Sequence, residues 1–474
     1  MRALSVKDRG TIDPCSGSMW DKMILYTLPI IFSNFMQLLY NAVDIAVVGQ
    51  FTGEDAVASV GATSPIIHVI VNVFIGISVG SAIRVSYYIG AKSEEDVRKT
   101  THTSMAAGIL FGLVGMVVGM VLARPGLIAM KTHPSLIPDA LTYMYLYLSG
   151  MIFSSVYNFG AVILRAGGET RKPMIYLLVS GLANVALNFL LTGLMGLGVI
   201  GVAAGTVVSQ LISAILVTVE LVRTKEVYRI ELKQIRIWWG KFGEIIKAGL
   251  PAGVQTAMFS FANLFVQSSI NACDVAVGAN NMLIAGYTAS GTIEGMLTTC
   301  IGSFGTTVTT FAGQNYGAGK MDRVDRVPKL VGLTCLCIWV VIATLALVGA
   351  PFFLSLSVDN PLALYYGAIK MKVVVCGCIF NMVADLFIAQ SRALGNSFTP
   401  MIVSVMTICV FRVIYLHTIQ PMIGSYLSII LVFPISYAIN TVFQAILYRR
   451  TRRHVGIVMA ARQGLRPNGE EKIA

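Results

Sequence analysis

One acidic residue in the first apolar segment has the surroundings that ion-coupled chemistry requires. Asp44 lies inside the apolar stretch 38–49, about one helical turn after Asn41. Placing a charged side chain in hydrocarbon costs at least about 2.5 kcal/mol, so an acid found there is a candidate functional group. A carboxylate without a fixed counter-cation can exchange a proton or a metal cation. The alternative is a structural acid that is paired with a donor on another helix.

Other polar residues within apolar segments could complete this site or form a second one. Asn184 and Asn188 are four residues apart and therefore share one helix face. Their amide oxygens could coordinate a hard cation or accept from a protonated carboxyl group, or the amides could simply hold helices together. In the second half of the chain, the candidates for coupling or substrate contact are Glu294, Asp385, Gln255 and Asn263.

No catalytic or metal-binding motif accompanies these residues. The segment 317–320 resembles the end of a phosphate-binding loop, but Gln314 replaces the first glycine of that motif and Met321 replaces its Ser or Thr. Two Cys-x-Cys pairs place their thiols on different helix faces, with no clustered histidines nearby. We therefore expect no enzyme, no structural metal and no cofactor.

The composition indicates which elements position the candidate residues. Of 474 residues, 55% are hydrophobic and 12% are charged, whereas soluble domains have about 25% charged residues. Twelve apolar segments are each long enough to cross a hydrocarbon core of about 30 Å as a helix. They cover residues 23–49, 62–89, 101–123, 139–164, 173–193, 197–222, 243–270, 280–310, 330–350, 364–391, 400–418 and 421–448. The sequence thus predicts an all-α integral membrane protein in a lipid bilayer.

An internal repeat relates the two halves of the chain. The segment 165–175 recurs as 392–402, and Gly90-Ala91 recurs as Gly317-Ala318, both at an offset of 227 residues. Each repeat holds six segments, and an even number returns the chain to its starting side. The halves should therefore have the same orientation and be related by an axis along the membrane normal.

The repeat and the basic residues together predict the organisation of the chain. Lys and Arg concentrate in the two tails and in the even-numbered loops, which predicts that both termini are cytoplasmic. The net charge of +12 follows from this topology, so no nucleic-acid partner is expected. The predicted parts are an N-terminal tail at 1–22, a first lobe at 23–222, a linker at 223–241, a second lobe at 242–448 and a basic tail at 449–474.

Several of these motifs resemble the multidrug and toxic compound extrusion (MATE) family. The most specific matches are 40–44 with Val48-Gly49, the stretch 90–92, and the doubled Arg-Ala-x-Gly-x-Thr/Ser-x-x-Pro blocks. The resemblance covers almost the whole chain. It implies twelve helices in two pseudo-symmetric six-helix bundles around a V-shaped central cavity, in a bacterial cytoplasmic membrane. It also implies an antiporter that exports small amphipathic, often cationic compounds in exchange for H⁺ or Na⁺.

The resemblance assigns coupling to Asp44 but leaves the ion open. In the proton-coupled branch of that family, the acid corresponding to Asp44 is the protonation site, and an Asn and an Asp four residues apart accompany it. This chain has Asn184 and Asn188 there, so the second acid is missing. In the sodium-coupled branch two further acids matter, and the corresponding stretches 258–260 and 380–382 contain none. The expected cation-coupling residues are Asp44, Asn41, Asn184 and Asn188.

Two other functions fit the sequence less well. A lipid-linked oligosaccharide flippase of the related superfamily would have additional spans and a cavity rich in basic residues, whereas this chain places few away from the cytoplasmic side: Arg412, Lys370 and Lys372. An integral-membrane transferase would need paired acids or a metal motif at an aqueous loop. We therefore expect a monomeric exporter that works by alternating access, whose substrate the sequence does not identify.

Overall fold

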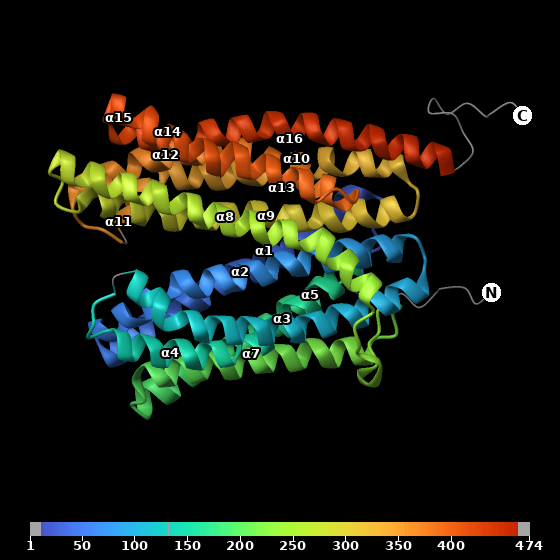
Figure 1. Cartoon of the computed structure of the whole chain (residues 1–474), viewed down its shortest axis with the longest axis horizontal. Helices are drawn as coiled ribbons and strands as arrows, with labels where there is room; N and C mark the ends of the chain where they lie inside the picture. The colour runs from blue at the N-terminus through green and yellow to red at the C-terminus, as the bar shows by residue number, and fades with distance from the viewer. Residues whose placement is uncertain (1–10, 131, 356, 463–474) are drawn as a thin grey trace, which may run out of the picture. The chain divides into compact units, whose positions relative to one another are not determined.

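The structure is a computed structural model that describes residues 11–130, 132–355 and 357–462, apart from the side chains at 41, 54 and 460–462. Within the described residues all regular secondary structure is helical, which confirms the all-α prediction. The chain divides into two compact units, Met1–Gly253 and Val254–Ala474. Figure 1 labels their helices in chain order.

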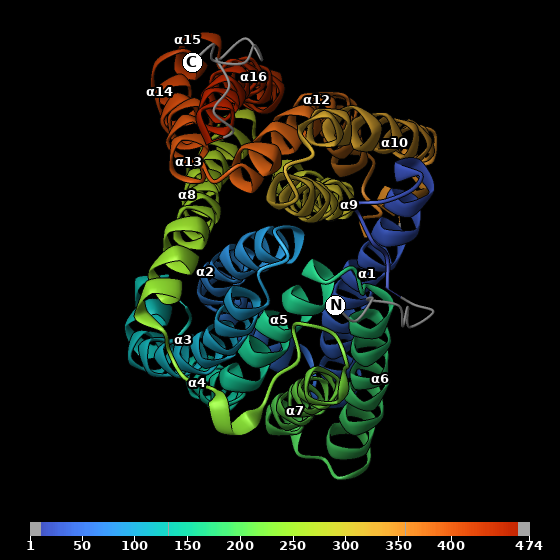
Figure 2. The ribbon, with the colours of Figure 1, turned by 90° about the vertical axis from the view of Figure 1, so that its right-hand side faces the viewer.

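The described part of the first unit contains seven α-helices and the beginning of an eighth. They are α1 (Met19–Thr52), α2 (Glu54–Gly90), α3 (Glu94–Ala129), α4 (Ile137–Ser149), α5 (Met151–Ala166), α6 (Arg171–Asn188) with the π-helix η1 (Phe189–Leu194), α7 (Gly198–Arg223), the 3₁₀-helix η2 (Leu232–Gln234) and the start of α8 (Trp239–Val277). Figure 2 looks along several of these helices and shows α2, α5, α6 and α7 grouped as a bundle. Helices α4 and α5 follow each other directly and are bent by 44° at the break between them.

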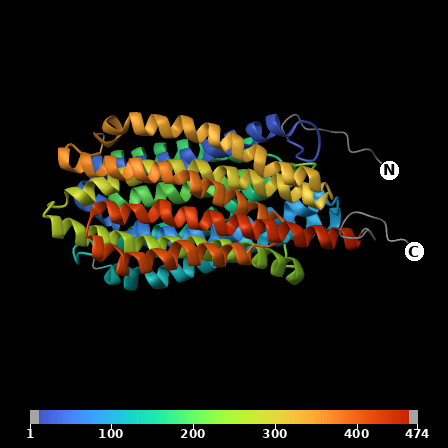
Figure 3. The ribbon, with the colours of Figure 1, turned by 90° about the horizontal axis from the view of Figure 1, so that it is seen from above.

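The second unit contains the remainder of α8 and a second series of helices. They are α9 (Met282–Gly317), α10 (Met321–Val348), α11 (Ala350–Ser355), α12 (Pro361–Ala393), α13 (Phe398–Ser404), the π-helix η3 (Val405–Val410), α14 (Phe411–Thr418), α15 (Gln420–Ile423) and α16 (Tyr426–Arg462). The red helix α16 is seen along its whole length in Figure 3. It continues through the basic cluster at 449–453, where the Arg452 guanidinium pairs with Asp325 at 2.6 Å.

The predicted membrane segments agree with these helices. Among the described residues, nine helices are long and apolar enough to cross a membrane, or ten if the bent pair α4–α5 counts as one span. Helices α8 and α9 are equally long but include more polar residues, among them Gln255 and Glu294. With these two helices, all twelve predicted segments have a helical counterpart.

The internal repeat extends to the backbone conformation of its most similar segment. Gly168 and Gly395, which are 227 residues apart, have φ angles of +92° and +91°. In both loops the glycine amide donates to the carbonyl three residues earlier, on Arg165 and Arg392, at 2.9 Å. This left-handed conformation ends α5 in the first unit and α12 in the second, and it favours glycine because a side chain is strained there.

A second pair of equivalent loops also has one conformation. After α2, the Lys92 amide donates to Ile89 at 3.1 Å, and after α9 the Gly319 amide donates to Tyr316 at 3.0 Å. Lys92 and Gly319 both have positive φ angles, of 56° and 73°. The two halves therefore use the same local turns at equivalent positions, even where only one of them has a glycine.

Candidate functional site

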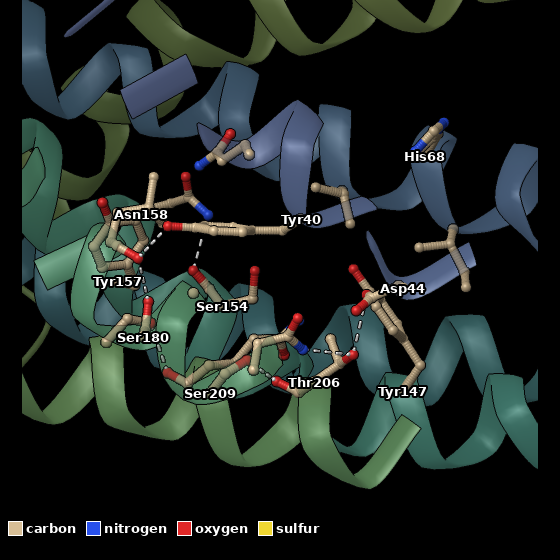
Figure 4. A pocket seen from close by; sticks show the side chains of 18 of the residues that line it. Tyr40, Asp44, His68, Tyr147, Ser154, Tyr157, Asn158, Ser180, Thr206 and Ser209 are labelled. Carbon is tan, nitrogen blue, oxygen red and sulfur yellow. Dashed lines mark hydrogen bonds between the residues drawn. The ribbon is translucent and has the colours of Figure 1, made fainter. Parts of the chain in front are cut away.

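A cavity of about 380 Å³ lies inside the first unit, between α1, α2, α4, α5, α6 and α7. Most of its lining side chains are polar, and the described lining includes one acid, Asp44, one histidine, His68, and no Lys or Arg. Figure 4 shows Asp44, Thr206 and Tyr147 near one end of this cavity, Tyr157 and Ser180 near the other, and Tyr40 between them. The cavity is therefore a polar chamber whose described lining contains a single carboxylate.

The Asp44 carboxylate is buried and bonded to neutral donors. Its side chain is on α1, and the residue is 8% exposed. The Asn188 amide on α6 donates to Oδ1, and the Thr206 hydroxyl on α7 lies 3.4 Å from Oδ2. That hydroxyl also lies 2.9 Å from the Val202 carbonyl, so its single proton is shared between two acceptors. Both carboxylate oxygens thus have a neutral donor, and no Lys or Arg is among the described residues that line the chamber.

The amide oxygens beside Asp44 remain available to a ligand. Asn188 is fully buried and its Oδ1 has no hydrogen-bond partner among the described atoms. Its amide nitrogen also lies 3.4 Å from Asn184 Oδ1, and the Asn184 amide donates to Thr206 at 3.3 Å. Carboxylate, amide and hydroxyl oxygens are the ligands that hard cations prefer, and an amide oxygen also accepts from a protonated carboxyl group. This group can therefore receive either a proton or a metal cation.

Local features of α6 and α7 bring Asn188 to Asp44. The π-helix η1 starts directly after Asn188, and such segments occur frequently at functional sites. On α7, a Cβ atom at Gly205 would lie only 2.4 Å from Asn188 Oδ1. The absence of a side chain at Gly205 thus allows Asn188 to pack against α7, next to Thr206.

Replacing Gly205 with Ala tests this packing. The added methyl group would displace Asn188 and weaken its hydrogen bond to Asp44. We therefore expect the free energy of unfolding to fall by about 1–3 kcal/mol. We also expect about tenfold slower efflux, in the usual range of coupling energies. The matched control is Gly61→Ala on α2, where a Cβ atom would meet nothing within 4 Å. Equal effects of the two substitutions, measured by transport and by thermal unfolding, would contradict this account.

Four tyrosines line the same cavity and were not identified from the sequence: Tyr40, Tyr143, Tyr147 and Tyr157. The Tyr40 hydroxyl donates to the Leu177 carbonyl at 2.9 Å, and the Tyr143 and Tyr147 rings stack at 6.0 Å. Aromatic faces attract organic cations. A signal was present, since Tyr143 and Tyr147 are four residues apart and so share a helix face. Thr206, which directly follows the closely spaced Gly201 and Gly205, was also not identified from the sequence.

The first-unit candidates are only partly brought together. Asp44, Asn184 and Asn188 form one hydrogen-bonded group. Asn158, at the repeat position of Asp385, lines the same cavity. The side chain of Asn41 lies outside the described residues, so its predicted role stays a prediction.

The four second-unit candidates each have a different principal partner. Glu294 forms an ion pair with Lys370 at 3.2 Å, and Asp385 accepts from Asn381 at 3.3 Å. Gln255 accepts from Arg392 at 2.6 Å, and Asn263 accepts from Arg412 at 3.1 Å. The described contacts thus do not join these residues directly into one site. Lys370, which the sequence placed away from the cytoplasmic side, is 2% exposed.

Comparison with known proteins gives this arrangement a context. The family model MatE matches residues 29–190 and 251–418, once in each half of the chain. The probable multidrug resistance protein YoeA of Bacillus subtilis is 27% identical, and the match covers 82% of this chain and 85% of that protein. The probable multidrug resistance protein NorM of Thermotoga maritima is 22% identical, with 82% and 83% covered.

Solved structures have the same fold. A transporter of the MOP superfamily from Pyrococcus furiosus superposes with a TM-score of 0.85 at 18% identity, covering 93% of this chain and 98% of that chain. A multidrug resistance MATE transporter in an outward-facing conformation gives a TM-score of 0.83, also at 18% identity, with 93% and 98% covered. These matches confirm the predicted two-lobed, twelve-helix fold.

The predictions of a transporter rather than an enzyme, and of a multi-pass membrane protein, are therefore confirmed by the relatives. Because the family model matches both halves of the chain, over well more than half of its length, this protein belongs to the MatE family of multidrug and toxic compound extrusion transporters.

Proposed function

We propose that this protein is a secondary antiporter that exports small amphipathic compounds in exchange for H⁺ or Na⁺, with Asp44 as the cation-coupled carboxylate. The observation that carries the proposal is the environment of Asp44. Its carboxylate is buried in a polar chamber, has neutral donors on both oxygens and has no Lys or Arg in the described lining. A buried carboxylate in this position is stabilised by an exchangeable cation.

Coupling requires that the two conformations of the transporter bind the cation differently. A ligand shifts a conformational equilibrium only by its difference in affinity between the states. Asn188 and Thr206 come from α6 and α7, while Asp44 is on α1, so a change in the packing of α1 changes this set of contacts. Cation binding at Asp44 then favours one packing of α1, and substrate binding favours the other. The reciprocal coupling of the two ligands follows from linkage.

The lining of the chamber supports organic cations as one class of substrate. The single carboxylate and the four tyrosine rings offer a charge and aromatic faces to a cationic amphiphile. The names of the bacterial relatives describe multidrug resistance and multidrug export proteins, and we extend that activity to this chain. We further propose a monomer in a bacterial cytoplasmic membrane with both termini in the cytoplasm.

Efflux from proteoliposomes under separately imposed pH and sodium gradients tests the function. We expect a fluorescent organic cation to leave the reconstituted vesicles faster when the concentration of either H⁺ or Na⁺ is higher outside the vesicles than inside. Protein-free liposomes and an ionophore that collapses the gradient are the controls. Efflux that ignores both gradients would overturn the proposal, and the gradient that drives efflux identifies the coupling ion.

A further inference from the structure

Arg412 is a buried cation in the second unit that the proposed coupling site does not use. It lies on α14, two residues after the π-helix η3, and is 2% exposed. Its Nε donates to Ser436 at 3.0 Å and its Nη1 donates to Asn263 at 3.1 Å. The guanidinium lies 4.5 Å from the Phe433 ring centroid. Its Nη2, by contrast, has no hydrogen-bond partner among the described atoms.

The charge of Arg412 has no carboxylate partner among the described residues. The acid on α9, Glu294, forms its ion pair with Lys370 instead. The polar atoms that interact with the guanidinium, on Ser436, Asn263 and Tyr437, are neutral oxygens. A buried charge without a counter-charge is strongly destabilising. Phe433 and Tyr437 offset part of this cost through their ring faces, but neither supplies a negative charge.

The donor without a partner, Nη2, lies on an edge of the guanidinium that can bind an oxyanion. Nη1 and Nη2 form one edge of the planar guanidinium, and a carboxylate binds such an edge with two parallel hydrogen bonds. On this edge one nitrogen has a neutral acceptor and the other has none. The neutral acceptor is the amide oxygen of Asn263, which is an exposed residue. An incoming carboxylate can therefore take the place of the Asn263 amide without displacing a buried side chain.

We propose that Arg412 is the residue that binds the carboxylate of those exported compounds that carry one. This inference rests on the proposed export function and specifies the chemistry of its substrates. The two units then differ in the charge they offer. The first has a carboxylate in a chamber without described Lys or Arg, and the second has a buried arginine that forms no ion pair with a described acid. A purely cationic substrate interacts with the Asp44 carboxylate and does not need Arg412.

A structural role for Arg412 makes a different prediction. If the guanidinium only packs α14 against α16 through Ser436, Phe433 and Tyr437, then its replacement lowers stability and affects all ligands alike. A ligand-binding role changes the relative affinity for two compounds that differ only in a carboxylate. The ratio of two affinities thus separates the two roles.

The experiment compares tetramethylrhodamine, which has a free carboxylate, with its methyl ester, which lacks that charge. Binding of each dye to the full chain in phosphatidylcholine nanodiscs is measured by fluorescence polarisation. We expect Arg412→Gln to weaken binding of the free acid about tenfold, as for loss of a charge-assisted pair of hydrogen bonds, and to leave the ester nearly unchanged. Arg412→Lys should retain part of the preference. Arg452→Gln, which removes a charge from the Asp325 ion pair near the end of α16, is the matched control.

The inference is overturned if the ratio of the affinity for the free acid to that for the ester is the same in Arg412→Gln as in the wild type. Discs that contain phosphatidylglycerol distinguish a lipid headgroup from a substrate. If the preference for the free acid is unchanged in those discs, Arg412 binds the substrate. If the preference is lost, the lipid headgroup occupies the site and the proposal is overturned. Gradient-driven efflux of the ester tests the export function separately, because that dye does not need Arg412.

Discussion

Replacing Asp44 with Asn is expected to abolish gradient-driven efflux while the protein still folds and inserts into the membrane. We expect the gradient-driven rate to fall about a hundredfold, to the level of protein-free liposomes. This ratio is near the upper end of the range that typical coupling free energies give. The measurement is efflux of a fluorescent cation from proteoliposomes under the gradient that drives the wild type.

The contacts of Asp44 explain why this substitution should remove coupling without unfolding the chain. The substituted amide has the same shape, its oxygen can still accept from Asn188, and its nitrogen can donate to the Thr206 hydroxyl. What is lost is the exchangeable negative charge. Neither a proton nor Na⁺ then distinguishes the conformations of the transporter at this position, so an imposed gradient can no longer do work on the substrate.

Asp325→Asn is the matched control for the loss of one carboxylate. Asp325 lies near the start of α10, and its side chain is 40% exposed and paired with Arg452. Its replacement should leave the gradient-driven rate within about twofold, because exposed ion pairs contribute little. Full efflux by Asp44→Asn at normal expression would refute the role assigned to Asp44.

The sequence predicted the helices and part of the first-unit site because both depend on short-range patterns. Apolar segments long enough to cross a membrane predict the spans, and the four-residue spacing of Asn184 and Asn188 places both on one helix face. The Asp44 environment stood out because a lone acid in an apolar segment is costly. In the structure both Asn188 and Thr206 contact this carboxylate.

The sequence could not predict pairings between helices. Thr206 is one of several hydroxyl residues on α7, and only the packing of α1 against α6 and α7 selects it as a neighbour of Asp44. Glu294 and Lys370 are 76 positions apart on different helices, and no local pattern links them. The orphaned nitrogen of Arg412 is likewise visible only when all its neighbours are in place.

The Lys370–Glu294 pair leads to the second large prediction, which concerns stability. The Lys370 side chain is 3% exposed and that of Glu294 is 17% exposed, with 3.2 Å between Nζ and Oε2. Nζ also donates to the Tyr287 carbonyl at 3.1 Å and lies 3.7 Å from the centre of the Tyr287 ring. Replacing Lys370 with Met keeps an unbranched side chain that is one atom shorter and leaves the Glu294 carboxylate without its cation. We expect a loss of about 3–5 kcal/mol in the free energy of unfolding.

Removing both charges tests whether the unpaired carboxylate causes that loss. In the double substitution Lys370→Met with Glu294→Gln no charge remains to be paired, so most of the lost stability should return, as seen when whole buried ion pairs are replaced. Lys372→Met is the control, because Lys372 lies two positions along α12 and is exposed; its effect should stay within about 0.5 kcal/mol. Chemical unfolding in mixed micelles measures all four proteins. If the double substitution is no more stable than Lys370→Met alone, the lysine contributes through its contacts with Tyr287 and not through the ion pair with Glu294.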